Sequence, residues 1–293
     1  MTGVLAQMGI AAGDDLLAPV DNENPRGFWE NRSVVMVHER LLKEIGSRWD
    51  DTRPLPDEWW VAARVAAFRE ELLGIVGAQF GDEPIWILKD PRMCRLLPLW
   101  LDLCNKIGVE LGFVNIFRQP FEVGLSLERR NGHSFEKSAL LWLTHNLEAE
   151  FWSRGYPRTF VRYRHLLFDP KGVVTRVGRD LNVRWPKGEV DGLQAVLTFM
   201  EPSLRHHSAE LDDRLLGSGF LSDLVLDTWK ALTEAAAEGR TADEARFDGL
   251  RARLAEYSRS TDTDFRGLRT RLLQRIRRIA VSVSECGGAQ GAN

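Results

Sequence analysis

GFVNIFRQP, residues 112–120, is the stretch that decides the fold. Its apolar residues form a short run typical of a buried β-strand, and the run ends in Arg118 just before Pro120, a residue suited to the first turn of a helix. Two further apolar runs also end in polar residues: IWILK at 85–89 and TFVRY at 159–163. Segments with helical periodicity separate the three runs, and this alternation predicts a parallel sheet covered by helices.

The ends of the three predicted strands are polar. In a parallel sheet, ligands bind outside the carboxyl ends of the strands, where side chains and helix N-termini converge. We therefore expect the functional site at this edge. The residues placed there are the pairs Lys89-Asp90, Arg118-Gln119 and Tyr163-Arg164.

The rest of the chain is expected to be mainly helical. Residues 33–46 and 57–79 have apolar faces at helical spacing, and the sequence beyond Pro202 is rich in charge and in helix-favouring residues. We divide the chain into an α/β domain over 1–220, a helical C-terminal extension over 221–285 and a disordered tail over 286–293. The extension is expected to pack on the domain or to mediate contact with a protein partner, including a second copy of the chain.

Composition excludes several classes of protein. A formal net charge of -3 gives no overall positive field, which argues against nucleic acid as a partner. The sequence has no apolar stretch of membrane-spanning length, no secretory signal and an odd number of cysteines, 3, so we predict a cytoplasmic protein. The motifs GxxxxGK[ST], GxGxxG and GxSxG are all absent.

Chemistry is concentrated in NIFRQPFEVGLSLERR, residues 115–130. An arginine at a strand end beside a helix N-terminus can bind phosphate through its planar fork of donors, and Ser126 would add a hydroxyl. The alternative is that Arg118 pairs with a carboxylate and Ser126 is an ordinary helix residue. Lys89, at the end of the 85–89 run, would point its ammonium toward the same edge, unless Lys89 or Arg92 simply pairs with Asp90.

These motifs resemble those of bacterial sulfotransferases. R-x-P-x-x-x-x-x-S is similar to the family's motif for the 3′-phosphate of 3′-phosphoadenosine 5′-phosphosulfate, which implies that Arg118 and Ser126 hold that phosphate. LKDPR followed by RLLPLW resembles the strand-end lysine motif, which implies that Lys89 contacts the phosphosulfate bridge. In VRYRHLLFDPKGVV, the resemblance places Tyr163 against the adenine; a half-buried aromatic with a satisfied hydroxyl is the alternative.

Two further segments extend the resemblance. NPRGFWENRSVVMVHERLL resembles the family's substrate-side stretch, which implies that Glu30 is the base for the acceptor hydroxyl, with Glu39 and His38 in reserve. Glu30 is equally suited to stabilise the positive end of the next helix. In EPSLRHHSAELDD, Arg205 would bind the cofactor from a basic loop, whereas a surface loop is the alternative. The two histidines that follow it have no third ligand at suitable spacing, so we predict no metal.

The resemblance implies an α/β fold with a parallel central sheet flanked by helices, similar to sulfotransferases and P-loop NTPases. It also implies transfer of a sulfuryl group from 3′-phosphoadenosine 5′-phosphosulfate to a hydroxyl, with a saccharide or glycoconjugate as acceptor. The family's first strand and phosphosulfate loop have no counterpart here, and we expect the true start to lie upstream of Met1. A noncatalytic binding or adaptor protein that has lost the loop is the alternative function.

Overall fold

The computed structural model describes residues 1–20, 27–200, 219–237, 239 and 241–260. Its contacts divide the chain into two units, 1–250 and 251–293. The second unit is described only over 251–260, which is helical. The first unit contains the following elements in chain order: α1 (Thr2–Gln7), α2 (Arg32–Glu44), the short 3₁₀ turns η1 (Trp59–Val61) and η2 (Ala63–Val65), α3 (Ala66–Phe80), α4 (Met93–Lys106), β1 (Phe113–Phe117), α5 (Pro120–Asn131), α6 (Phe135–Trp152), β2 (Arg158–Arg162), α7 (Tyr163–Phe168), α8 (Pro170–Asp180), α9 (Glu189–Phe199) and α10 (Phe220–Ala235).

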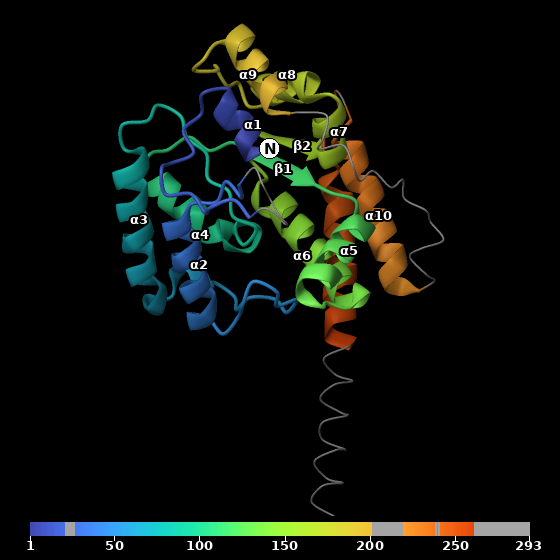
Figure 1. Cartoon of the computed structure of the whole chain (residues 1–293). Coiled ribbons are helices and arrows are strands. Elements are labelled where there is room, and N and C mark those ends of the chain that lie inside the picture. The colour runs from blue at the N-terminus through green and yellow to red at the C-terminus, as the bar shows by residue number, and fades with distance from the viewer. Residues whose placement is uncertain (21–26, 201–218, 238, 240, 261–293) are drawn as a thin grey trace, which may run out of the picture. The chain divides into compact units, whose positions relative to one another are not determined.

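The sheet in the described residues is small and parallel. β1 pairs with β2 in parallel, with Phe113 opposite Arg158 and Phe117 opposite Arg162. Figure 1 shows the two strands side by side. α7 and α8 pack against β2, and α6 contacts β1. Two of the three predicted strands are therefore present within one residue of their predicted bounds, in a fold that is largely helical with an α/β core.

The third predicted strand, 85–89, does not form a ladder. It makes one isolated parallel bridge, in which the N–H of Ala11 donates to the carbonyl of Ile85 at 3.3 Å and the N–H of Ile87 donates to the carbonyl of Ala11 at 2.8 Å. A strand needs successive partners along an edge. The described part of the chain supplies only this one, so the extended central sheet of the prediction is reduced to two strands.

Local capping explains where the helices beside the sheet begin. Gln119 caps α5 by accepting from the N–H of Glu122 at 2.7 Å, and Pro120 is the first helical residue. Gly132 ends α5 with φ of 65°, a conformation that glycine adopts at little cost. Ser134 then caps α6. The predicted helix over 57–79 was wrong in its first part, which forms η1 and η2 before α3 begins.

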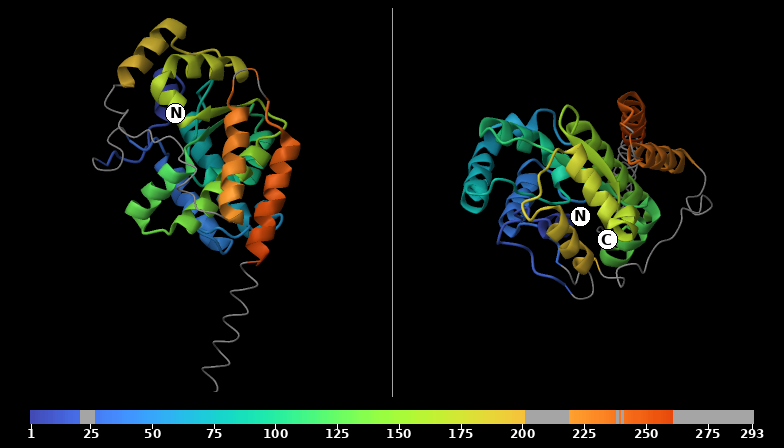
Figure 2. Two further views of the ribbon diagram at one scale, coloured as in Figure 1. Left: turned by 90° about the vertical axis from the view of Figure 1, so that its right-hand side faces the viewer. Right: turned by 90° about the horizontal axis from the view of Figure 1, so that it is seen from above.

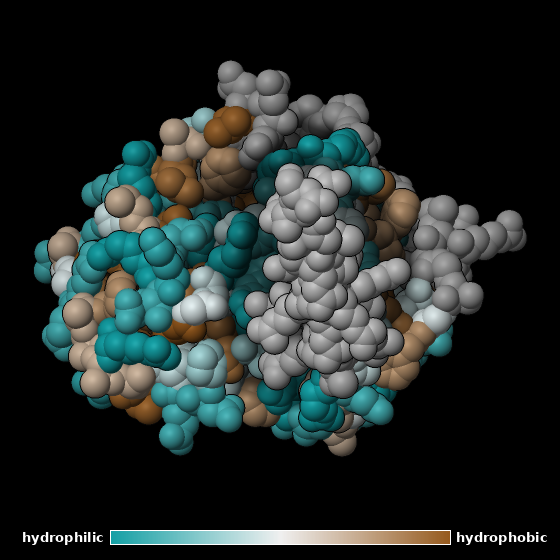
Figure 3. Space-filling view, turned by 90° about the horizontal axis from the view of Figure 1, so that it is seen from below, coloured by the Kyte–Doolittle hydropathy of each residue, from teal (hydrophilic) through white to brown (hydrophobic). Residues whose placement is uncertain are grey.

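Two apolar clusters form the core of the first unit. One joins α2, α3 and α4 around side chains such as Leu41, Leu72 and Leu99, and the other joins α1, β2, α8 and α9 around Met8 and Val174. Much of the outer face drawn in Figure 3 is hydrophilic where grey atoms do not cover it. Within the described ranges, no helix has both the length and the apolar character needed to cross a membrane.

α10 and residues 244–250, the helical end of the first unit, lie side by side, as Figure 2 shows. Arg246 joins them through an ion pair with Glu234 at 2.6 Å. α10 also contacts β2 and α6, and its Trp229 packs against Phe117 of β1 and Trp142 of α6. The boundary between the two units, at 250, lies inside the segment that the sequence assigned to a helical extension.

Candidate functional site

Lys89 and Glu30 meet directly, although 59 residues separate them in the chain. The ammonium of Lys89 donates to the Glu30 carboxylate and to the carbonyl of Phe28, the latter at 3.3 Å. Glu30 is buried, whereas the Lys89 side chain is 38% exposed. Asn31, rather than Glu30, caps α2 by accepting from the N–H of Val34. The Glu30 carboxylate therefore engages the lysine and not the helix end.

Asp90 anchors the turn that carries Lys89. Its carboxylate accepts from His38 Nδ1 at 2.8 Å and from Arg92 at 2.9 Å. Trp100 Nε1 lies 2.9 Å from His38 Nε2, so both ring nitrogens of His38 have a partner and the imidazole is held in place between Asp90 and Trp100. Burial alone would raise the pKa of Asp90, but the hydrogen bond and the charge of His38, followed by the charge of Arg92, outweigh it and lower the pKa to about 2.

The sequence left open whether Lys89 or Arg92 pairs with Asp90. Arg92, not Lys89, pairs with Asp90, and Arg92 also donates to Glu39. His38 and Glu39, the two residues held in reserve as bases, are thus both engaged in the anchor. His38 is fully buried. Neither residue approaches the Glu30 carboxylate in the contacts between described residues.

Arg118 lies at the carboxyl end of β1 and contacts the start of α7. Its guanidinium carbon is 5.3 Å from the centroid of the Tyr163 ring, and its Nε donates to Glu122 Oε2 at 2.7 Å. Trp142 Nε1 fixes the backbone by donating to the Arg118 carbonyl at 2.9 Å. Arg118 thus pairs with a carboxylate, which was the alternative considered from the sequence. Its two Nη groups make no hydrogen bond in the contacts among described residues. Tyr163 is half-buried.

Ser126 is exposed on α5. It is four residues after Glu122, so the two side chains share one face of the helix. The structure therefore gives Arg118, Glu122 and Tyr163 as one group, with Ser126 further along the same helix. Arg205, His206 and His207 lie outside the described residues. Within the described ranges, no three His, Cys, Asp or Glu side chains form a metal-binding group.

A cavity of about 920 Å³ lies along residues 85–89 and β1. Its walls come from 83–91 on one side and 108–117 on the other, and Met1 and Thr2 also line it. Lys89 is among the lining residues, whereas Arg118, Ser126, Tyr163 and Glu30 are not. The structure thus brings the predicted residues together as two pairs, Glu30 with Lys89 and Arg118 with Tyr163, and no described contact joins the pairs.

Sequence reasoning missed the partners that position these pairs. Glu122, Trp142 and His38 were not recognised as positioning residues, although the i, i+4 spacing of Arg118 and Glu122 was a readable signal. The buried contacts of His38 and Trp142 depend on tertiary packing and left no local pattern. Tryptophans in the first part of the chain pack against other aromatic rings: Trp29 against Phe199, Trp59 against Trp60, and Trp60 against Trp152.

No family model matches the chain, and no curated protein matches it. Among solved structures, the chain is similar to a sulfotransferase domain from the curacin biosynthetic pathway, with 14% sequence identity, coverage of 87% of this chain and 93% of that domain, and a TM-score of 0.39. Similarity at this level is too weak to assign a family or a site.

Proposed function

We propose that this chain binds 3′-phosphoadenosine 5′-phosphosulfate and transfers its sulfuryl group to a hydroxyl of a saccharide or glycoconjugate. The observation that carries the proposal is the contact between Glu30 and Lys89, which joins a carboxylate and an ammonium from distant segments, with Lys89 lining a cavity. Motifs at Lys89, Arg118, Ser126 and Tyr163 that resemble those of sulfotransferases support the choice of cofactor.

In the proposed reaction, the acceptor oxygen attacks sulfur while the bond from sulfur to the bridging phosphate oxygen breaks. The acceptor proton passes to Glu30, and the products are a sulfate ester and adenosine 3′,5′-bisphosphate. Negative charge develops on the departing phosphate oxygen, where the Lys89 ammonium would offset it. In the present structure the two groups neutralise each other, so cofactor binding would draw Lys89 away and free the carboxylate to act as a base.

Arg118 and Ser126 would hold the 3′-phosphate of the same nucleotide, with Tyr163 against the adenine. Arg118 is suited to this because its Nε is fixed by Glu122 and its ring contact with Tyr163 orients the plane of the guanidinium. The two Nη groups would then face an anion with their geometry preset. Arg205, which the sequence predicts to bind the cofactor, lies outside the described residues, and its role remains a proposal.

Calorimetric titration with adenosine 3′,5′-bisphosphate tests the nucleotide half of this site. The nucleotide lacks the sulfuryl group, so its binding needs only the residues proposed for the 3′-phosphate and adenine. We expect Arg118→Ala to weaken binding at least about 10-fold, the loss of one charge-assisted contact. Arg129→Ala, an exposed arginine on the same helix, should leave binding unchanged. Absence of binding to the unaltered chain would overturn the cofactor assignment.

Transfer is measured separately with sulfur-labelled cofactor and a panel of saccharides. Lys89→Ala should lower the rate about 100-fold, and Glu30→Gln by a similar factor, because each removes one group from the transition state. Nucleotide binding without label transfer to any acceptor would favour the noncatalytic binding protein instead. Equal rates for Lys89→Ala and the unaltered chain would contradict the proposed role of the lysine.

A further inference from the structure

Trp29, the residue before Glu30, has an unfavourable backbone conformation. Its φ is 56°, in the left-handed region, where a bulky side chain costs free energy because its Cβ crowds the backbone. Of the described residues other than glycine, only Glu58 and Asn182 also have a positive φ, and asparagine adopts it more readily than tryptophan does. A strained residue persists only where its surroundings hold it, and such residues cluster at functional sites. The neighbours of Trp29 must therefore supply the contacts that keep its backbone left-handed.

The indole of Trp29 is held between α1 and α9, two helices that contact each other. Its ring meets the ring of Phe199 edge to face, with 5.9 Å between the centroids and 82° between the planes. On α1 the indole lies against Gly3, where an added Cβ would be 2.7 Å from Trp29 Nε1 and 2.8 Å from Phe199 Cζ. Atoms that are not bonded do not pack this closely, so glycine at position 3 leaves the room that both rings need. We call the contact of the Trp29 ring with Gly3 and Phe199 the indole clamp.

Lys89 binds groups on both sides of Trp29. Its ammonium donates to the Phe28 carbonyl, before Trp29, at 3.3 Å, and to the Glu30 carboxylate after it. The backbone of Glu30 is itself fixed, because its carbonyl accepts from the N–H of Leu17 at 2.8 Å. The φ angle of Trp29 sets how the Phe28 carbonyl is oriented relative to Glu30. Rotation of Trp29 to a negative φ would therefore turn the Phe28 carbonyl away from the lysine.

We propose that Trp29 is a positioning residue for sulfuryl transfer. Through the indole clamp it keeps its backbone left-handed, and this backbone presents the Phe28 carbonyl and the Glu30 carboxylate to Lys89. When the cofactor draws the lysine away, the same backbone keeps the Glu30 carboxylate in place for the acceptor. This inference rests on the proposed function for the use of Glu30 and Lys89 in transfer, whereas the clamp depends only on contacts within the described residues.

The first experiment compares Trp29→Ala with Trp29→Gly in the full chain. Both substitutions remove the indole, but glycine adopts a positive φ at little cost, whereas alanine without the clamp relaxes to a negative φ. We expect the rate of label transfer from the sulfur-labelled cofactor to fall about 100-fold in Trp29→Ala, as for a misplaced reacting group, and about 10-fold in Trp29→Gly. The KM for the cofactor should not change, since Arg118 and Ser126 are unaltered. A residue that only packs would not give this order, because alanine retains more contacts than glycine, and equal or reversed rates would overturn the proposal.

Gly3→Ala tests the indole clamp with Trp29 still in place. The added methyl group has no room beside the two rings, so it displaces the indole and releases the backbone at 28–30. We expect the rate of transfer to fall about 10-fold. Gly74→Ala is the matched control, because it also replaces a helical glycine but its Cβ would meet no neighbouring group within 4 Å. Equal rates for the two alanine variants would overturn the role of the clamp.

Acylation of Lys89 tests the positioning without any transfer. Each chain is treated with acetic anhydride, and modification of Lys89 is measured by peptide mass spectrometry relative to Lys106, which is exposed on α4. Because Trp29→Ala loses the Phe28 carbonyl as an acceptor, its Lys89 should be modified about 3-fold faster than in the unaltered chain, the effect of one hydrogen bond. Trp29→Gly should stay close to the unaltered chain.

The two readouts separate the inference from the function on which it rests. Absence of label transfer by the unaltered chain would overturn the proposed function, and acylation of Lys89 would still decide whether Trp29 positions the pair. Equal modification of Lys89 in Trp29→Ala, Trp29→Gly and the unaltered chain would overturn the positioning role. If Trp29→Ala does not fold, Gly3→Ala replaces it, with faster modification than Gly74→Ala as the supporting result and equal modification as the contradicting one.

Discussion

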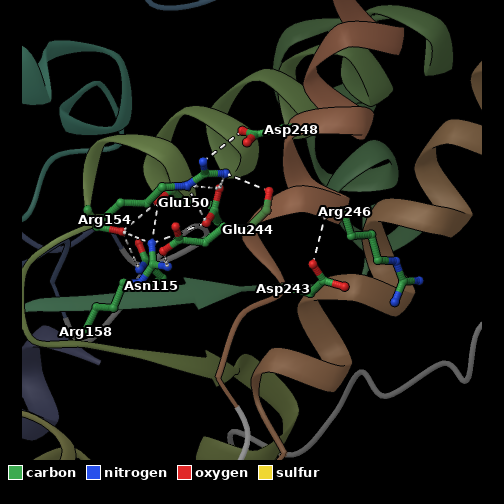
Figure 4. Close-up of polar contacts among 9 residues, drawn as sticks. Asn115, Glu150, Arg154, Arg158, Asp243, Glu244, Arg246 and Asp248 are labelled. Carbon is green, nitrogen blue, oxygen red and sulfur yellow. Dashed lines mark hydrogen bonds and ion pairs between the residues drawn. The ribbon is translucent and has the colours of Figure 1, made fainter.

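The ion pairs around Glu150 and the pair formed by Glu30 and Lys89 use the same types of group in opposite ways. Glu150 is completely buried near the end of α6 and binds Arg154 at 2.8 Å and Arg158 at 3.3 Å. As Figure 4 shows, both arginines continue to carboxylates on the helical segment that begins at 244, with Arg158 reaching Glu244 and Arg154 reaching Asp248.

The network around Glu150 is closed at its centre, because Glu150, Arg154 and Arg158 each have several partners within the protein. Asn115 extends it to β1 by donating to Ser153, which in turn donates to the Glu150 carbonyl. Lys89, in contrast, has one carboxylate and one carbonyl as partners, and it faces a cavity large enough for a ligand. This difference indicates that the network around Glu150 stabilises the fold, whereas Lys89 and Glu30 are free to interact with a ligand.

Removing each carboxylate in turn tests this difference most strongly. Glu150→Gln keeps the shape of the side chain but leaves two largely buried arginines without their shared anion. We expect a loss of about 3 kcal/mol in the free energy of unfolding, the range found for breaking a buried pair. Glu30→Gln leaves Lys89 free to turn to solvent and should cost less than about 1 kcal/mol.

Urea denaturation of the two variants gives both numbers under one set of conditions. Glu244→Gln is the matched control within the closed network, since its carboxylate is 52% exposed and its loss should cost about 0.5 kcal/mol. Equal destabilisation by the substitutions at 150 and 30 would mean that Lys89 and Glu30 are also part of the framework, and the contrast between the regions would fail.

The pH dependence of stability tests whether Asp90, the neighbour of Lys89, stabilises the fold as the network around Glu150 does. The pKa of Asp90 is lowered to about 2 in the folded chain, below the ordinary value of 3.8. The carboxylate therefore contributes stability that is complete above pH 4 and is lost as the pH falls toward 2. We expect this contribution to be about 2 kcal/mol.

The measurement is the free energy of unfolding between pH 5 and pH 2, compared with Asp90→Asn. The variant should be less stable near pH 5 and should lose less stability on acidification. Asp82→Asn, at an exposed position one loop away, should follow the unaltered chain. Parallel pH curves for the unaltered chain and Asp90→Asn would show that this carboxylate is not held by His38 and Arg92.

Local signals allowed much of the sheet edge to be predicted. The strand ends at Arg118 and near Tyr163 follow from short apolar runs that stop at polar residues, and the start of α5 follows from Pro120. These features depend on neighbours in the sequence. The capping of α5 by Gln119 is local in the same sense, because donor and acceptor are three residues apart.

Long-range partners account for what the sequence did not reveal. Residues 85–89 have the composition of a strand, but a ladder requires an edge from elsewhere, and the described chain supplies only Ala11. The contact of His38 with Asp90 spans 52 positions, and its contact with Trp100 spans 62. Nothing in the local sequence distinguishes a buried structural histidine from a catalytic one. The partners of His38 in the fold, Asp90 and Trp100, make that distinction.

The smallest expected effect concerns Arg118 and tests whether its guanidinium is available to an anion although Glu122 is bound to it. Glu122 holds Arg118 Nε at 2.7 Å and so competes with any anion for the same guanidinium. Glu122→Gln keeps an oxygen that can accept from Nε, and so keeps Arg118 oriented, but it removes the competing charge. Binding of adenosine 3′,5′-bisphosphate should therefore tighten about 3-fold in calorimetry, equivalent to about 0.6 kcal/mol. Glu128→Gln, exposed on the same helix, should have no effect. If Glu122→Gln instead weakens binding, the carboxylate aligns the arginine more than it competes, and Arg118 would need its partner in place to bind phosphate, as the arginines around Glu150 need theirs to hold the fold.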